Sequence, residues 1–225
     1  MLTFLSELDW SPLWISLKTG IAATIISFFM GIYFARYVVN ARGRRKSVID
    51  AILTLPIVLP PTVAGFILLR IFGLRRPMGA FLLEALDIKV VQTWLGCVIA
   101  ATVISFPLMY HNAKSAFEQI DCSIIHAAET LGMSNHEIFW RIQLPLAKPG
   151  IMSGIVLTFA RALGEYGATA MLAGNIPGRT STISQRIAMV IQDGDYQTAG
   201  FWTVIVILIG FAIIVWVRLL TDKEK

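Results

Sequence analysis

Arg161 and Glu165 are the residues of this sequence whose charge and position point most directly to an action on a ligand. They lie four residues apart, at the end of the apolar stretch Leu146–Leu163. A spacing of four places both side chains on one face of a helix, where they can neutralise each other as an ion pair. Alternatively, Arg161 adds positive potential to a path for an anion, because charged residues in apolar surroundings are costly and are usually paired or functional.

The other residue types that do chemistry are not arranged for catalysis or metal binding. His111, His126 and His136 have no metal-ligand spacing, and two cysteines, Cys97 and Cys122, do not make a zinc site. No lysine follows a glycine, so the Gly-Lys pair of a phosphate-binding loop is missing. We therefore expect no catalytic residue, no metal and no cofactor. A membrane-embedded enzyme is a rival hypothesis, and it would need a cluster of nucleophiles, bases or metal ligands within the apolar blocks.

The composition indicates that helices in a membrane position these residues. Hydrophobic residues make up 56% of the 225 residues and charged residues only 15%, against about 25% charged in a soluble domain. The apolar residues gather in blocks suited to a bilayer core, which needs about 20 apolar residues per helix. The net charge of +5 does not predict nucleic-acid binding, because the basic residues flank these blocks without interleaved aromatic residues. The expected spans are Leu13–Val39, Val48–Phe72, Thr93–Tyr110, Leu146–Leu163 and Phe201–Leu220.

The loops predict the orientation of the chain. The first loop reads ARGRRK, and its basic residues are Arg42, Arg44, Arg45 and Lys46. The positive-inside rule places this loop in the cytoplasm, so that five spans leave the N-terminus outside and the C-terminus inside. The three arginines of RIFGLRRP, which fall on the predicted outer side, are contrary to this rule. The long outer segment 164–200 contains apolar residues at helical spacing, and we expect a short re-entrant helix or a sixth membrane helix within 181–192.

The second block is interrupted by prolines. Pro56, Pro60 and Pro61 in LTLPIVLPPTVAG each lack a backbone N–H, so an unbroken helix is not available. The block is either a kinked packing helix or a broken helix that lines a path or gate, a device that recurs in transporters. The candidate residues of a path or gate are Pro60, Pro61, Thr62, Gly65, Arg161 and Glu165.

The first block carries a row of small residues. Gly20, Thr24, Ser27 and Gly31 are spaced so that they share one face of a helix. Small residues let helices approach closely in lipid. The row therefore predicts either packing within the chain or a subunit interface.

Segment 121–145 carries the signals of two short polar helices. Asp121 is a good N-cap for the first helix, and Gly132 is placed to end it in a left-handed conformation. Ser134 and Glu137 form the S-x-x-E capping box of the second helix, which we expect to stop at Leu144 and Pro145. Both helices carry an apolar face, which must be buried against the chain's own spans or against a partner.

The stretch HAAETLGMSNHEIFWRIQLP, residues 126–145, resembles the EAA loop of the permease subunits of ATP-binding-cassette importers. In that family an E-A-A-x-x-x-G stretch is followed, nine residues later, by I-x-L-P, and this spacing is kept here. His126 stands where the family usually has Glu, which leaves the role of that side chain open. The resemblance implies a cytoplasmic coupling helix that docks on a separate ATPase subunit, present in two copies. The expected coupling residues are Ala127, Ala128, Glu129, Gly132, Ile142, Leu144 and Pro145.

Two more stretches, LPIVLPPTVAGFILL and FARALGEYGATAMLAGNIPGRT, are similar to the molybdate branch of these permeases. The resemblance implies the all-α membrane fold of MetI-like importer permeases. That fold is one transmembrane domain over 1–225, with its core at about 13–220, five to six membrane helices and a coupling loop at 111–145. It also implies a homodimer in the lipid of the cytoplasmic membrane, which receives molybdate from an extracytoplasmic binding protein. Tungstate and sulfate or thiosulfate stay open as substrates, and a membrane scaffold that only recruits a partner stays open as a function.

Overall fold

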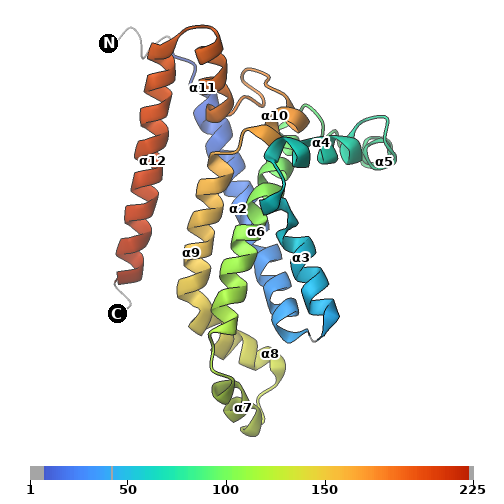
Figure 1. Cartoon of the computed structure of the whole chain (residues 1–225), viewed down its shortest axis with the longest axis vertical. Helices are drawn as coiled ribbons and strands as arrows, with labels where there is room; N and C mark the ends of the chain where they lie inside the picture. Colours follow the sequence, from blue (N-terminus) through green and yellow to red (C-terminus); the bar gives the residue numbers. More distant parts are fainter. Residues whose placement is uncertain (1–7, 42, 223–225) are drawn as a thin grey trace.

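The computed structural model describes residues 8–41 and 43–222, and all regular structure in these two ranges is helical (Figure 1). Arg42, which was counted with the basic loop, lies outside the described residues. The four long helices are α2 (Ser11–Asn40), α6 (Trp94–Glu118), α9 (Leu144–Leu163) and α12 (Tyr196–Asp222). The shorter elements are α3 (Arg44–Val58), α4 (Pro61–Phe72), α5 (Pro77–Leu86), α7 (Cys122–Thr130), α8 (Asn135–Ile138), the π-helical turn η1 (Phe139–Gln143), α10 (Gly167–Ala173) and α11 (Ile183–Gln192).

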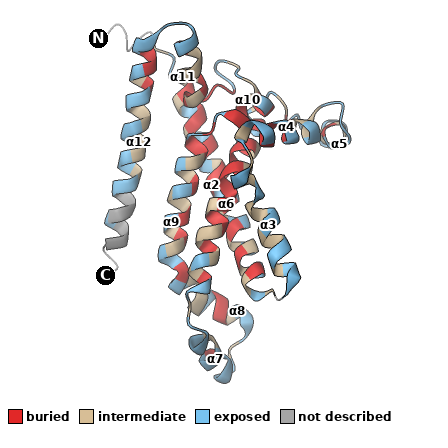
Figure 2. Cartoon of the chain, in the orientation of Figure 1, coloured by how far each residue is buried: buried red, intermediate tan, exposed pale blue. Residues whose placement is uncertain are grey.

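Helices α2, α6 and α9 pack side by side as a central bundle, and the buried residues run along it (Figure 2). A Cβ on Gly31 of α2 would lie 2.7 Å from Cγ of Met109, and a Cβ on Gly154 of α9 would lie 2.9 Å from Cβ of Asn112. The helices therefore approach more closely than larger side chains allow, as packing in lipid favours. The row of small residues on α2 is buried within the chain, so of the two alternatives the structure shows packing within the chain.

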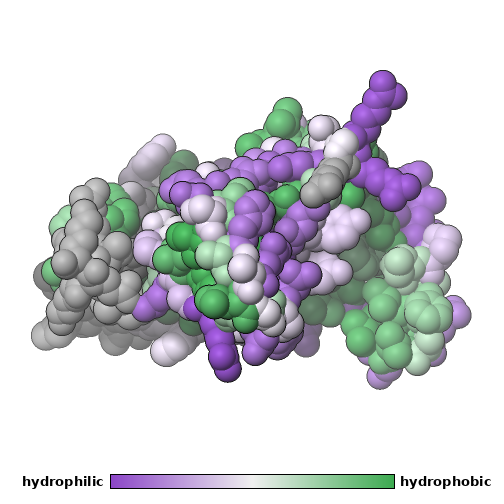
Figure 3. Space-filling model, turned by 90° about the horizontal axis from the view of Figure 1, so that it is seen from below, coloured by the Kyte–Doolittle hydropathy of each residue, from purple (hydrophilic) through white to green (hydrophobic). Residues whose placement is uncertain are grey.

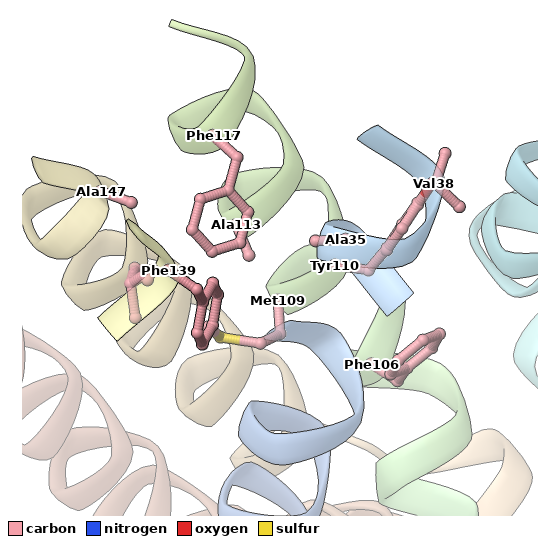
Figure 4. Packing of buried hydrophobic residues seen from close by; sticks show 10 residues of the cluster. Ala35, Val38, Phe106, Met109, Tyr110, Ala113, Phe117, Phe139 and Ala147 are labelled. Atoms are coloured by element: carbon pink, nitrogen blue, oxygen red, sulfur yellow. The ribbon is translucent and has the colours of Figure 1, made fainter. Parts of the chain in front are cut away.

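An apolar cluster ties the lower half of this bundle to η1 (Figure 4). It contains Ala35, Val38, Phe106, Met109, Tyr110, Ala113, Phe117, Phe139, Ala147 and Ile151. Phe139 of η1 packs against Phe117 of α6, with ring centroids 6.0 Å apart. The short helices below the bundle are thus anchored to it by buried aromatic side chains.

The predicted spans correspond to four long apolar helices and to a fifth, bent pair. The pair is α3 and α4, which meet at an angle of 112°. Helix α6 continues to Glu118, so the predicted end at Tyr110 was too early. Residues 111–118, which the sequence placed in the coupling loop, form the last two turns of α6.

The predicted stop at Leu144 and Pro145 was wrong. The Leu144 N–H donates to the carbonyl of Phe139, five residues earlier, and this π-helical turn joins α8 to α9. Pro145 lies in the first turn of α9, where the missing N–H and the fixed φ of proline are tolerated. The chain is consequently helical from Asn135 to Leu163.

The segment 181–192 does not form a sixth membrane helix. Helix α11 starts with a capping box between Thr182 and Gln185 and has ten residues, or about 15 Å of rise, half of the roughly 30 Å bilayer core. It packs against α12 and the start of α2, where the Ile183 N–H donates to Oγ of Ser16 at 2.8 Å.

Helix α12 contacts α11 and α9 but stands away from the rest of the bundle (Figure 1).

Replacing Gly31 by Ala should destabilise the bundle by about 1–3 kcal/mol, the cost of overpacking a close contact. The added Cβ would meet both the Met109 side chain and the backbone nitrogen of Tyr110, at 3.2 Å. The control is Gly210→Ala on α12, where an added Cβ has no neighbour within 4 Å. This substitution should stabilise α12 by up to about 1 kcal/mol, because alanine has a higher helix propensity than glycine. Thermal unfolding of each purified variant in detergent measures the change in stability. Equal changes in Gly31→Ala and Gly210→Ala would contradict close packing at Gly31.

Candidate coupling and gating sites

Helix α7 is held at both ends by the residues that the sequence predicted. Oδ1 of Asp121 accepts the Ser123 N–H at 2.8 Å, and this bond holds the pKa of the Asp121 carboxyl below its ordinary value. At the other end Gly132 has φ +77°, and the Met133 N–H donates to the carbonyl of Ala128 at 3.1 Å. The predicted N-cap and the predicted left-handed glycine are therefore confirmed.

The capping box of α8 is also confirmed. The Glu137 N–H donates to Oγ of Ser134 at 3.3 Å, and Oε2 of Glu137 accepts the Ser134 N–H at 2.9 Å. These reciprocal bonds satisfy donors that a helix start leaves without partners. They fix the turn between α7 and α8, so that Leu131 and Gly132 form the tip of a helical hairpin.

The apolar face of this hairpin is only partly covered by the chain itself. Ala128, Ile138 and Phe139 are buried, whereas Leu131 is 82% exposed at the tip. Among the predicted coupling residues, four are exposed: Ala127, Glu129, Gly132 and Pro145. Ile142 and Leu144 are partly buried, in the continuous helix that runs from α8 through η1 into α9. Figure 3, which views the molecule from this end, shows hydrophilic side chains across the middle of the face with apolar ones among them. Leu131 was missed as a candidate residue, although it follows Ala128 by three positions on the same face.

Besides the short chain link at residues 119–121, which leads from α6 into α7, two connections join the hairpin to the bundle. The guanidinium of Arg36 on α2 lies 3.9 Å from the ring centroid of Phe139, and its Nη2 donates to the carbonyl of Asn135 at 3.3 Å. The second connection is the continuous rod from α8 into α9. A pocket of about 600 Å³, lined by Ser115, Asp121, Ile124, Leu146 and Pro149 among others, lies between α7 and the lower ends of α6 and α9. Helix α7 is thus set off from the bundle along this pocket, whereas α8 continues directly into α9.

The second apolar block is a broken helix and not a kinked one. Pro56 lies inside α3 without ending it, and the break falls at Leu59 and Pro60, where α4 begins with Pro61. At the break α4 packs closely on α10, because a Cβ on Gly65 would lie 2.7 Å from Cα of Ala168. A Cβ on Gly167 would lie 3.0 Å from Cβ of Pro61 and 3.2 Å from the nitrogen of Thr62. The predicted path residues on α4 thus face the start of α10.

Glu165 and Arg161 hold the other side of this junction. Glu165 is 2% exposed, and its Oε2 accepts from Nη1 of Arg161 at 2.9 Å. Its Oε1 accepts the Ala168 N–H at 2.8 Å, in the first turn of α10. The carboxylate therefore neutralises Arg161 and also fixes α10 to the end of α9. All six predicted path residues border one junction between α4, α9 and α10.

A ladder of polar contacts attaches α3 to α6. Helix α3 has no buried residue, although Ile49 and Leu53 are partly buried against the apolar cluster of the bundle. Polar contacts add to this packing. Lys46 pairs with Glu118 at 3.2 Å, and Lys114 pairs with Asp50 at 2.8 Å. The Tyr110 hydroxyl also donates to Asp50, and one turn further Thr54 Oγ1 lies 3.2 Å from Nε2 of His111. These rungs, which we call the α3–α6 ladder, keep the lower half of the broken span on the bundle.

The ladder was missed by the sequence analysis. Its members recur every four residues on α3, at 46, 50 and 54, and at 110, 114 and 118 on α6. That spacing marks one polar face on each helix. It does not say that the two faces meet, because the register between helices far apart in the sequence depends on the rest of the bundle.

The fold and these sites define a membrane protein in which a helical hairpin lies at one end of a helical bundle that also contains a broken span. The chain belongs to the family of binding-protein-dependent transport system inner membrane components, whose model matches residues 24–223. The molybdenum transport system permease protein ModB of Escherichia coli is 42% identical over 84% of this chain and 82% of its own length. The putative molybdenum transport system permease protein YvgM of Bacillus subtilis is 38% identical over 92% of both chains. The sulfate transport system permease protein CysT of Salmonella typhimurium is 31% identical over 87% of this chain and 75% of its own.

Solved structures share the fold. A chain of the MetNI methionine ABC transporter in an inward-facing conformation superposes with a TM-score of 0.74 at 15% identity, over 95% of this chain and 94% of that one. A chain of a bacterial alginate ABC transporter, solved with an alginate-bound periplasmic protein, superposes with a TM-score of 0.77 at 14% identity. The match covers 99% of this chain and 82% of that one. The expectation of an all-α importer-permease fold is confirmed.

Replacing Asp50 by Asn should loosen α3 by about 1.5–3 kcal/mol, the contribution of a hydrogen bond to a charged group. The side chains of Lys114 and Asp50 are only 14% and 31% exposed, so the ammonium would lose its partner in a partly buried position. The control is Lys46→Gln, which breaks a more exposed pair and should cost at most about 1 kcal/mol. Hydrogen–deuterium exchange over residues 44–58 gives the opening free energy.

The exchanged pair Asp50→Lys with Lys114→Asp should recover much of the protection. Exchange in Asp50→Asn that matches the wild type would show that α3 is held by something other than the ladder.

Proposed function

We propose that this chain is the permease subunit of an ATP-driven importer that carries molybdate across the cytoplasmic membrane. The observation that supports this most directly is the 42% and 38% identity to proteins named as molybdenum transport permeases. Two copies of the chain work with two copies of a separate ATPase subunit and with an extracytoplasmic molybdate-binding protein. ATP hydrolysis belongs to the ATPase, and this chain contributes the membrane path.

The hairpin of α7 and α8 receives the motion of the ATPase in this proposal. Leu131 at its tip is an exposed apolar side chain that a cleft on a partner can bury, with Ala127, Glu129 and Gly132 beside it. Ala128 packs the hairpin internally, and Ile142, Leu144 and Pro145 lie on the rod that carries the motion into α9. Arg36 carries it into α2 through Phe139. A movement of the hairpin tip is therefore transmitted to both α9 and α2.

The path lies beside the junction of α4, α9 and α10, where Pro60, Pro61, Thr62 and Gly65 form the gate. The break at Pro60 lets α3 and α4 change their angle without loss of backbone hydrogen bonds within either helix. Arg161 faces this region as a cation whose charge Glu165 already balances. A doubly charged oxyanion therefore binds only weakly at this mildly positive site. Transport requires binding that is weak enough for the anion to be released.

The position of the hairpin supports an inference about the orientation of the chain. Arg45 shares a pocket with Arg36, and Arg36 contacts α8, so the basic loop and the hairpin lie at the same end (Figure 1). We infer that this end is cytoplasmic, with the N-terminus outside and the C-terminus inside. The three arginines at 70, 75 and 76 then lie on the outer side.

Sulfate, thiosulfate and tungstate are the alternative substrates. The identity to a sulfate permease, 31%, is lower than to the molybdenum permeases. We expect radiolabelled molybdate uptake in cells to require this chain, to be inhibited by excess unlabelled tungstate and to be unaffected by sulfate. Inhibition by sulfate would move the proposal to the sulfate branch. Uptake that persists without the chain, in cells with no second molybdate system, would contradict the molybdate proposal.

Replacing Gly132 by Val should uncouple ATP hydrolysis from uptake. No atom lies within 4 Å of a Cβ at this position, so the effect is conformational: a non-glycine residue at φ +77° costs about 1–2 kcal/mol. The control is Gly132→Asn, because asparagine tolerates the left-handed conformation and should keep most of the uptake. Transport and ATPase rates of the reconstituted complex measure the coupling, and normal uptake by Gly132→Val would remove the mechanical role of this turn.

A further inference from the structure

A pocket of about 540 Å³ lies at the lower end of α2, where the chain turns into α3. It is lined by Tyr33, Arg36, Tyr37, Asn40, Ala41 and Arg45. Of these residues the proposed coupling uses Arg36, and the proposed gate uses none. Its walls combine two guanidinium groups with two aromatic rings, so the pocket is suited to an anion that also carries apolar surface.

The start of α3 places cations where a helix favours anions. The N-terminus of a helix carries a partial positive charge and exposes unbonded N–H groups. Helix α3 nevertheless begins with Arg44, Arg45 and Lys46, its N-cap Gly43 supplies no side-chain bond, and its first turn has no acidic residue. Lys46 is balanced by Glu118, but neither Arg44 nor Arg45 forms an ion pair with a described residue. This end of the protein therefore has a surplus of positive charge.

The face of α2 above the pocket is apolar and then aromatic. Ile26, Met30, Tyr33 and Tyr37 follow one another at helical spacing and are exposed, the two tyrosines by 65% and 53%. Tyrosine is enriched where the bilayer core meets the headgroups. Along this face the surface changes from apolar to aromatic to cationic, which is the order of chemical groups in a phospholipid from its acyl chains to its phosphate.

We propose that this pocket binds the headgroup of an acidic phospholipid, with its phosphate between Arg45 and Arg36 and its acyl chains along Ile26 and Met30. The lipid belongs to the leaflet on the side of the hairpin, where the surface is rich in acidic lipids when that side is cytoplasmic. Arg36 also stacks on Phe139 and donates to Asn135. A bound phosphate therefore fixes the same guanidinium that joins the hairpin to α2. This site adds a lipid ligand to the transport function and does not depend on the identity of the transported anion.

The test measures binding of phosphatidylglycerol to the purified chain by native mass spectrometry, with phosphatidylcholine of the same acyl chains, a zwitterion of zero net charge, as the comparison. We expect phosphatidylglycerol to be retained more strongly, and Arg45→Gln to weaken it about fivefold, the factor for one basic residue near an anionic surface. The matched control is Arg44→Gln. It removes the same charge from the adjacent, exposed position, which does not line the pocket, and it should change retention much less.

A photoreactive phosphatidylglycerol probe on the wild-type chain gives a readout that needs no variant. Its crosslinks should fall within residues 26–45. The proposal would be overturned by equal retention of the two lipids, by equal losses in Arg45→Gln and Arg44→Gln, or by crosslinks confined to other segments. Displacement of the lipid by glycerophosphate at the same concentration would overturn it too, because it would assign the pocket to a soluble phosphate.

Discussion

The close approach of α2, α6 and α9 is the constraint on which the rest of the structure depends. In lipid there is no hydrophobic force between helices, so they associate where small side chains let backbones pack. The contacts form successive layers one turn apart: Ala23, Ala101 and Ala162, then Ser27, Ser105 and Thr158, then Gly31, Met109 and Gly154. The hydroxyls of the middle layer are buried without a hydrogen-bond partner among the described residues, so they contribute small size to the packing and not bonds.

The parts around this bundle combine polar and apolar attachments. Helix α3 is held by the α3–α6 ladder and by apolar side chains packed on the core of the bundle. The hairpin is held by Arg36 and by the buried ring of Phe139. Helix α10 is held by Oε1 of Glu165 and by buried apolar contacts with α4 and α6. A polar contact can exchange partners at a modest cost, whereas a close-packed core resists small deformations.

The sequence was most informative where structure is decided locally. The caps at Asp121 and Ser134 and the left-handed Gly132 each depend on a few neighbouring residues, and each was predicted. The interruption of the second span by prolines was also predicted, but the sequence did not decide between a kink and a break. The continuity of α8 with α9 was missed because a π-helical turn has no sequence signature comparable to a proline. The pairing of Asp50 with Lys114 was missed because these residues are 64 positions apart, and only the packed bundle sets their register.

The distribution of charge connects the packing to transport. Lys18 near the upper end of α2 lies over the ring of Trp94, and Arg161 is balanced by Glu165. The arginines without an ion pair to a described residue include Arg44 and Arg45, at the end that carries the hairpin. Had Glu165 been neutral, Arg161 would present an uncompensated cation beside the proposed gate and bind a doubly charged anion tightly. Because the same carboxylate also caps α10, this balance of charge is tied to the geometry of the junction. A movement of α10 against α9 would therefore change both the width of the proposed path and its attraction for an anion.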